Sequence, residues 1–275
     1  MIIDANDWVG GTETVHDILT RSLIDRYRAT VGGLENHEVA PLGLHWCLGT
    51  PNTPVQELGL DGHPKKGGFL PPISLPRRMW ASSHVSFRAP LQIGSPFQRH
   101  SSVEKIVPKS GSSGELVFVT VKHVISSGDE ECIRERQTIV YREASPEMQA
   151  LPTDANFEKP DSAHQFTVTP STQLLFRYSA LTFNSHRIHY DAEYAALESY
   201  PALVVHGPLM ASLLLRLASN VLGEGAIESF EFRGHSPAYC GQDILFCFGF
   251  LDDPERMEVR GNDGRLVMSA RVKKR

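Results

Sequence analysis

Hydrophobic positions along the chain form two series of short elements, separated by a polar stretch. In the first series, apolar residues at helical spacing predict a helix over residues 12–31, with Val15 and Leu23 on one face, that ends at Gly32. Residues 34–79 are rich in proline and glycine, which predicts a long irregular segment. Such segments often form one wall of a binding pocket, and a solvated connection is the alternative.

Residues 80–143 are predicted to form an antiparallel meander. Residues 115–125 are β-branched and alternate between apolar and polar positions, which is typical of a strand with one buried face. A polar turn at 126–129 follows, and the chain returns as another strand over 132–141.

The polar, proline-containing residues 146–165 are predicted to link two units, 1–145 and 166–275. The second unit is predicted to contain a short helix that begins at Asp191 and a long helix over 207–222, which is apolar on nearly all sides and therefore buried. Strands are predicted at 229–233, 243–251, 258–259 and 266–272, with Asn262-Asp263-Gly264 as a hairpin turn.

The two units share a short repeat. Pro90 and Gly94 recur as Pro237 and Gly241, 147 positions further along. Two such matches could arise by chance, but with the repeated order of helix and sheet they indicate a duplicated α+β unit.

Composition narrows the class of protein. The chain has 41% hydrophobic and 21% charged residues and a net charge of −5, so we expect a globular protein and no nucleic-acid partner. Its four cysteines form no CxxC pair, which indicates reduced thiols. We find no signal peptide and no apolar run long enough to cross a membrane, and we therefore expect a cytoplasmic protein.

The densest polar cluster lies between two apolar elements of the second unit. It contains Asn184, His186, Arg187 and His189, and His206 follows shortly afterwards. An imidazole can take and give a proton near neutral pH, so His189 is a candidate acid–base. A hydrogen-bonded structural histidine is the alternative.

Gly207 opens the predicted long helix, with Pro208 at its first turn. Free amides at a helix start can stabilise an oxyanion, although a tight turn would also explain this glycine. The spacing of His186 and His189 is permitted for zinc, but no cysteine or acidic third ligand has an obvious place, so we expect no metal. No nucleotide-binding glycine motif and no Gly-x-Ser-x-Gly elbow is found, so we expect no cofactor.

The residues Thr182-Phe-Asn-Ser-His-Arg-Ile-His-Tyr-Asp191, together with Val205-His-Gly-Pro-Leu-Met-Ala-Ser212, resemble the motif of MaoC-like, (R)-specific enoyl-CoA hydratases. They are more similar to the branch with mitochondrial 3-hydroxyacyl-thioester dehydratases and bacterial mesaconyl-C4-CoA and itaconyl-CoA hydratases. Leu75-Pro-Arg-Arg-Met-Trp-Ala81 and Glu135–Glu143 are also typical of that branch.

The resemblance implies an α+β double hotdog fold, which is two helix-wrapped antiparallel sheets in one chain. It implies one active site, in the second unit, while the first unit forms a wall of the acyl pocket. By position, His189 matches the catalytic histidine, Asn184 the catalytic aspartate, and Gly207 the glycine whose N–H faces the thioester carbonyl. It also implies an acyl-CoA substrate, and a homodimer is compatible with it.

The departures from the family motif shape the hypothesis. Asn184 is an amide, so it can orient a water but cannot move its proton. We place His186, Arg187 and Arg177 among the substrate contacts, because an extra guanidinium suits an acyl group with its own carboxylate; binding of a CoA phosphate is equally open. The predicted reaction is hydration of itaconyl-CoA or mesaconyl-CoA to citramalyl-CoA. The alternatives are a 3-hydroxyacyl-thioester dehydratase of fatty-acid synthesis and a non-catalytic acyl-CoA-binding subunit.

Overall fold

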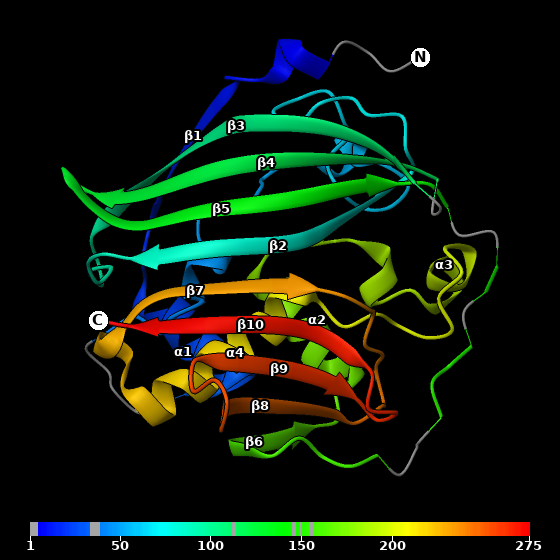
Figure 1. The fold of residues 1–275 in the computed structure, drawn as a ribbon. Helices are drawn as coiled ribbons and strands as arrows, with labels where there is room; N and C mark the ends of the chain where they lie inside the picture. Colours follow the sequence, from blue (N-terminus) through cyan, green and yellow to red (C-terminus); the bar gives the residue numbers. More distant parts are fainter. Residues whose placement is uncertain (1–4, 34–38, 112–113, 145–146, 149, 154–156) are drawn as a thin grey trace.

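The computed structural model describes residues 5–33, 39–111, 114–144, 147–148, 150–153 and 157–275. In this part of the chain, ten strands form one continuous antiparallel sheet in the order β1-β3-β4-β5-β2-β7-β10-β9-β8-β6 (Figure 1). The strands are β1 (Thr12–Ile18), β2 (Arg77–Phe87), β3 (Pro96–Gly111), β4 (Gly114–Ser127), β5 (Glu130–Arg142), β6 (Ser162–Val168), β7 (Ile227–Gly234), β8 (Ile244–Phe250), β9 (Arg256–Gly261) and β10 (Leu266–Lys274).

The helices α1 (Arg21–Val31), α2 (Thr172–Leu181) and α4 (Gly207–Leu222) lie behind the second half of this sheet in Figure 1, and α3 (Ala192–Leu197) lies at the right of the view. The chain also has short 3-10 turns: η1 (Ala5–Trp8), η2 (Leu44–Cys47), η3 (Val55–Glu57), η4 (Arg187–His189) and η5 (Glu224–Ala226). Helix α4 is buried over most of its length and contributes to the main hydrophobic core. This confirms the prediction from its apolar sequence.

The two halves are related by an internal repeat, as the sequence indicates. Strands β2 and β7 occupy equivalent places and pair with each other from Ser82–Arg233 to Ser86–Ser229, which joins the halves into one sheet. The turn after β2 donates two N–H groups to the Cys132 carbonyl, and the turn after β7 donates the equivalent two to that of Val267. The predicted α+β double hotdog fold is therefore confirmed.

The predicted helix over 12–31 is wrong in its first part. Residues Thr12–Ile18 form the edge strand β1, which pairs with β3, and the helix α1 begins only after Thr20, whose side chain caps it. Strand β1 is largely exposed, so its apolar residues carry no clear strand alternation. Their spacing therefore mimicked the pattern of a helix.

The halves differ in their helices. Within its described residues, the first half has only α1 and the turns η1, η2 and η3, and nothing there corresponds to the long helix α4. Apolar side chains between residues 69 and 75 pack instead against the inner strands near Tyr141. Residues 69–75 of the irregular segment expected over 34–79 thus cover part of one face of the first half-sheet.

The linker prediction needs a correction at its end. Strand β6 begins at Ser162, inside the predicted range 146–165, because it pairs with the buried strand β8. Residues 146, 149 and 154–156 of that range lie outside the described residues. The division into a non-catalytic unit 1–145 and a catalytic unit 166–275 stays a prediction.

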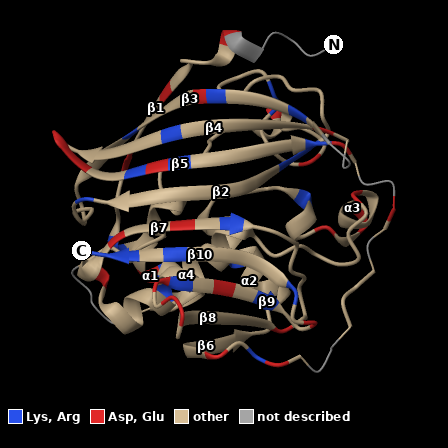
Figure 2. Cartoon of the chain, in the orientation of Figure 1, with Lys and Arg blue, Asp and Glu red and all other residues tan. Residues whose placement is uncertain are grey.

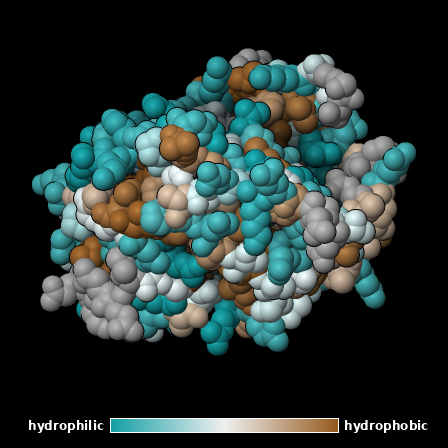
Figure 3. Space-filling view, turned by 60° about the horizontal axis from the view of Figure 1, so that its bottom comes forward, coloured by the Kyte–Doolittle hydropathy of each residue, from teal (hydrophilic) through white to brown (hydrophobic). Residues whose placement is uncertain are grey.

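The surface mixes charges and hydropathies. Acidic and basic residues are both scattered over the strands in Figure 2, and hydrophobic residues are interspersed with hydrophilic ones on the face in Figure 3. No helix in the described ranges is long and apolar enough to cross a membrane.

Candidate active site

Three segments meet around the predicted motif. The residues after α2 lead through the turn η4 to α3, the start of α4 lies beside them, and a loop over residues 58–64 crosses over from the first half. The short helix α3 follows Asp191, whose side chain caps it as predicted. The motif is thereby held between α2 and α3.

His189 is buried at one end of this site. Its Nδ1 donates to the Val204 carbonyl at 2.7 Å, and its ring stacks on that of His206 with centroids 3.6 Å apart. The hydrogen bond leaves a lone pair on Nε2, which has no hydrogen-bond partner among the described residues. Burial lowers the pKa of His189 to about 4, although the bond to Val204 opposes the shift. The side chain is therefore a neutral base at pH 7.

A cavity of about 660 Å³ opens onto His189. The end of α1 and the start of α2 form its walls, and Arg177 and Leu203 also line it. The cavity therefore offers a small molecule a place next to His189.

Gly207 begins α4 next to the stacked histidines. His206 precedes it without a side-chain cap, and the space where a Gly207 Cβ would lie is open. The first N–H groups of a helix have no intrahelical acceptor, so they can receive negative charge there. His206 itself bonds Ser179 through Nε2 at 2.9 Å, and its buried Nδ1 has no partner among the described residues.

Asn184 is used locally. Its Oδ1 accepts the backbone N–H of His186 at 3.0 Å, and its own N–H donates to the Ser179 carbonyl at 2.8 Å. The amide oxygen that sequence reasoning assigned to a water thus stabilises the turn that carries His186.

The two candidate arginines lie in different surroundings. Arg187 donates to Asp191 at 2.7 Å and to the Leu60 carbonyl at 3.2 Å, and its guanidinium lies over the Tyr194 ring. Arg177 lines the cavity with an exposed side chain, and its guanidinium makes one hydrogen bond within the described part of the chain, at 3.4 Å to the Ala29 carbonyl. Arg177 is therefore the one available to a ligand.

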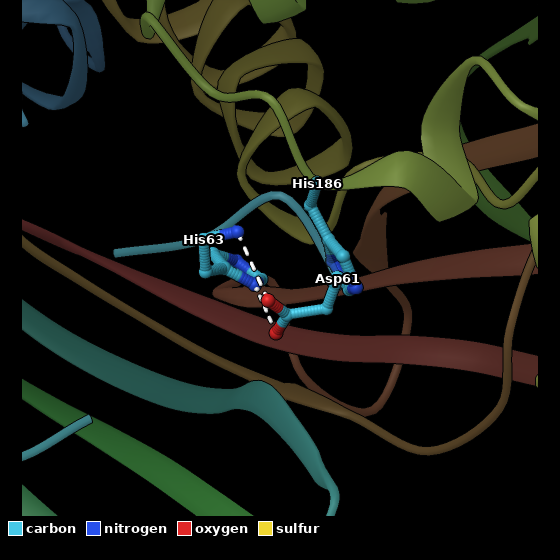
Figure 4. A group of neighbouring side chains, drawn as sticks. All are labelled: Asp61, His63 and His186. Atoms are coloured by element: carbon cyan, nitrogen blue, oxygen red, sulfur yellow. Dashed lines mark hydrogen bonds and ion pairs between the residues drawn. The ribbon is translucent and has the colours of Figure 1, made fainter. Parts of the chain in front are cut away.

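Sequence reasoning missed two groups of the loop 58–64. His63 Nδ1 donates to Asp61 at 3.0 Å, and the His63 ring lies 4.1 Å from that of His186, centroid to centroid (Figure 4). One ring nitrogen each of His63 and His186 and a carboxylate oxygen of Asp61 lie within 4.8 Å of one another, which would also suit a cation. Asp61 is thus the acidic group for which the sequence offered no obvious place. The only available signal was a carboxylate and an imidazole in a segment predicted to form a pocket wall.

The cluster contains four neighbouring imidazoles. The rings of His186 and His189 are perpendicular, 5.4 Å apart. Burial lowers the pKa of His186 to about 2 and lowers those of His63 and His206 as well. At neutral pH the imidazoles are therefore uncharged, and they can accept protons or hydrogen bonds.

The sequence matches known proteins over most of its length. A family profile described as hydroxyacyl-thioester dehydratase type 2 matches residues 43–240. The mesaconyl-C(4)-CoA hydratase of Chloroflexus aurantiacus is 42% identical over 274 residues, covering 96% of each chain. The mitochondrial hydroxyacyl-thioester dehydratase type 2 of Schizosaccharomyces pombe is 29% identical over 266 residues, covering 84% of this chain and 88% of its own.

Solved structures match the fold. HtdX of Mycobacterium tuberculosis superposes with a TM-score of 0.71 at 16% identity, covering 96% of this chain and all of its own. A second M. tuberculosis protein, with a double hotdog fold, superposes with a TM-score of 0.61 at 12% identity, covering 97% and 96%. At such identities the likeness concerns architecture alone.

Proposed function

Because the chain belongs to the hydroxyacyl-thioester dehydratase type 2 family and is a hydro-lyase of acyl thioesters, we propose that it hydrates a dicarboxylic enoyl-CoA, mesaconyl-CoA or itaconyl-CoA, to citramalyl-CoA. The observation that carries this proposal is the 42% identity to a mesaconyl-C(4)-CoA hydratase over 96% of both chains. At this coverage the alignment extends over both halves of the chain.

In the proposed reaction His189 is the base. The water oxygen bonds to Cβ of the enoyl group while its proton passes to His189 Nε2, which is free because Nδ1 is engaged by Val204. The electron pair of the double bond moves towards the thioester oxygen. The Gly207 N–H at the start of α4 stabilises that oxygen, and protonation of Cα completes the addition.

We assign recognition of the acyl carboxylate to Arg177 rather than to Arg187. Arg177 lines the cavity that reaches His189, whereas Arg187 is already paired with Asp191. A guanidinium can bind a carboxylate through two parallel hydrogen bonds. His186 stays a proposed contact near the acyl group, because its ring is next to that of His189.

The decisive experiment is a hydration assay with mesaconyl-CoA, itaconyl-CoA and crotonyl-CoA, in which the loss of the enoyl-thioester absorbance measures turnover. We expect faster turnover of a dicarboxylic substrate than of crotonyl-CoA. His189→Ala should lower kcat by at least about 100-fold, while His84→Ala, an exposed histidine on β2, should leave it unchanged. Near-normal turnover by His189→Ala would show that the base is elsewhere.

A dehydratase of 3-hydroxyacyl thioesters is the second candidate. It is favoured by the family profile and by the mitochondrial relatives of S. pombe and Saccharomyces cerevisiae. Higher kcat/KM for crotonyl-CoA than for either dicarboxylic substrate would support it. Tight binding of these esters without any turnover would instead support a non-catalytic acyl-CoA-binding subunit.

A further inference from the structure

The loop 58–64 is fixed against the motif by contacts along its backbone. The Arg187 N–H donates to the Asp61 carbonyl at 2.9 Å, and Ser185 Oγ donates to the Gly62 carbonyl. At Gly62 the loop and the motif lie so close together that a Cβ would fall 1.8 Å from the Ser185 carbonyl oxygen. Asp61 and His63 are therefore held in position relative to the motif.

These contacts place a carboxylate and two imidazoles in sequence beside His189. Asp61 Oδ2 accepts from His63 Nδ1, so the free nitrogen of His63 is Nε2. The His63 ring lies 4.1 Å from that of His186, which in turn lies 5.4 Å from that of His189. No described side chain or carbonyl occupies the ring nitrogens of His186. Figure 4 shows the three side chains converging.

We propose that Asp61, His63 and His186 form an acid–base relay that supplies the second proton-transfer group of the hydration, the work that the amide of Asn184 cannot do. This proposal rests on the proposed function. Asp61 and His63 act through His186, so they are positioning and proton-holding residues and His186 is the group next to the substrate.

The relay completes the proton balance of the reaction. Water gives its proton to His189 Nε2 as its oxygen bonds to Cβ, and Cα takes a proton from the relay as the enolate collapses. The proton on His189 then passes to His186, which restores both groups. One water is added to the double bond, and no proton is gained or lost overall.

The electrostatics favour this division of labour. Burial would raise the pKa of the Asp61 carboxyl, but the hydrogen bonds from His63 outweigh it and hold the pKa below its usual range. Asp61 therefore stays ionised, and its hydrogen bond to His63 opposes the effect of burial, which lowers the pKa of His63. His189 has no such anion, and burial lowers its pKa to about 4. Two environments that separate a proton holder from a base are typical of acid–base pairs.

A cation at these residues is the competing interpretation. It is less favoured because Asp61 and His63 already bond each other, and because the positive charge of Arg78 acts on all three groups. The test below includes it as an outcome.

The experiment compares pH profiles of kcat for the wild type, Asp61→Asn and His63→Gln, with the substrate that the wild type turns over best. Asp61→Asn keeps the Oδ1 that accepts the His63 N–H, so the turn is preserved. Asp129→Asn, which changes the same charge on the exposed turn between β4 and β5, is the control. Melting temperatures of all variants are measured in parallel.

We expect Asp61→Asn to lower kcat at least about 10-fold and to move the alkaline limb down by about one pH unit, because an anion beside an imidazolium raises its pKa by that order. His63→Gln should remove the limb. Unchanged pH profiles would overturn the relay. An equal loss of kcat at every pH would also overturn it, because it indicates a structural role. Activity that disappears with EDTA and returns with zinc would overturn it as well. No hydration by the wild type would overturn the proposed function itself, whereas these results with an active wild type concern the relay alone.

Discussion

Gly62 offers a quantitative test of how the two halves are joined at the site. Its φ is +86°, and a Cβ there would lie 1.8 Å from the Ser185 carbonyl oxygen. In Gly62→Ala the left-handed backbone costs about 1–2 kcal/mol. Relief of the overlap requires a shift of roughly 1 Å, which breaks the two backbone contacts of Asp61 and Gly62 with the motif, at about 1 kcal/mol each.

The expected destabilisation is therefore about 3–4 kcal/mol. For a chain of this size, that corresponds to a melting temperature lower by roughly 6–14 °C. Thermal unfolding followed by circular dichroism measures it, and the hydration assay should show a loss of at least about 10-fold, because Asp61 and His63 move with the loop.

The matched control is Gly94→Ala. Gly94 has a nearly equal φ of +81°, but no heavy atom lies within 4 Å of the place of its Cβ. It should lose only the backbone cost of about 1–2 kcal/mol and keep its activity. If Gly62→Ala has the same melting temperature as Gly94→Ala and the same kcat as the wild type, the close approach of the loop to the motif is not required.

Two further predictions concern buried and exposed charges. Burial raises the pKa of Glu135 to about 7, although hydrogen bonds from Ser83 and Trp46 oppose the shift. Because the pKa is higher in the folded protein, the free energy of unfolding should be largest below about pH 4.5. It should fall by on the order of 3 kcal/mol as the pH rises to about 7. Glu135→Gln should remove this decline in urea titrations at pH 5 and pH 8, and an unchanged decline would assign it to another group. Arg177→Met should raise KM for dicarboxylic substrates about 10-fold and leave that for crotonyl-CoA unchanged, whereas an equal rise for all substrates would assign Arg177 to CoA.

Elements with strong local patterns could be predicted from the sequence. The long helix α4 is apolar over its whole length, and the helix α3 has an aspartate at its start, so both were placed correctly. Strands β4 and β8 were predicted from β-branched or apolar runs that are buried in the structure. Burial of apolar side chains dominates the stability of these elements, so their sequences show it as apolar or alternating runs.

Elements at the edges could not be predicted in this way. Strands β1 and β6 each have one strand neighbour and little buried surface, so no alternation marks them. Helix α2 was missed because it buries only Leu175 and Tyr178, although Ser171 caps it.

The candidate site shows the same division. His189 and Gly207 are found from one continuous motif, but Asp61 and His63 precede it by more than 110 residues in the sequence. Their proximity depends on backbone contacts between a loop of one half and a turn of the other. No periodicity in a single sequence reports such a contact.

The turns after β2 and β7 have the same hydrogen-bond pattern in both halves. Each turn directs two N–H groups at one carbonyl of the neighbouring strand, at Cys132 and at Val267. Because β2 and β7 also pair with each other, both turns hold the strands at which the halves join. A substitution that disturbs either turn is therefore expected to affect the junction between the halves.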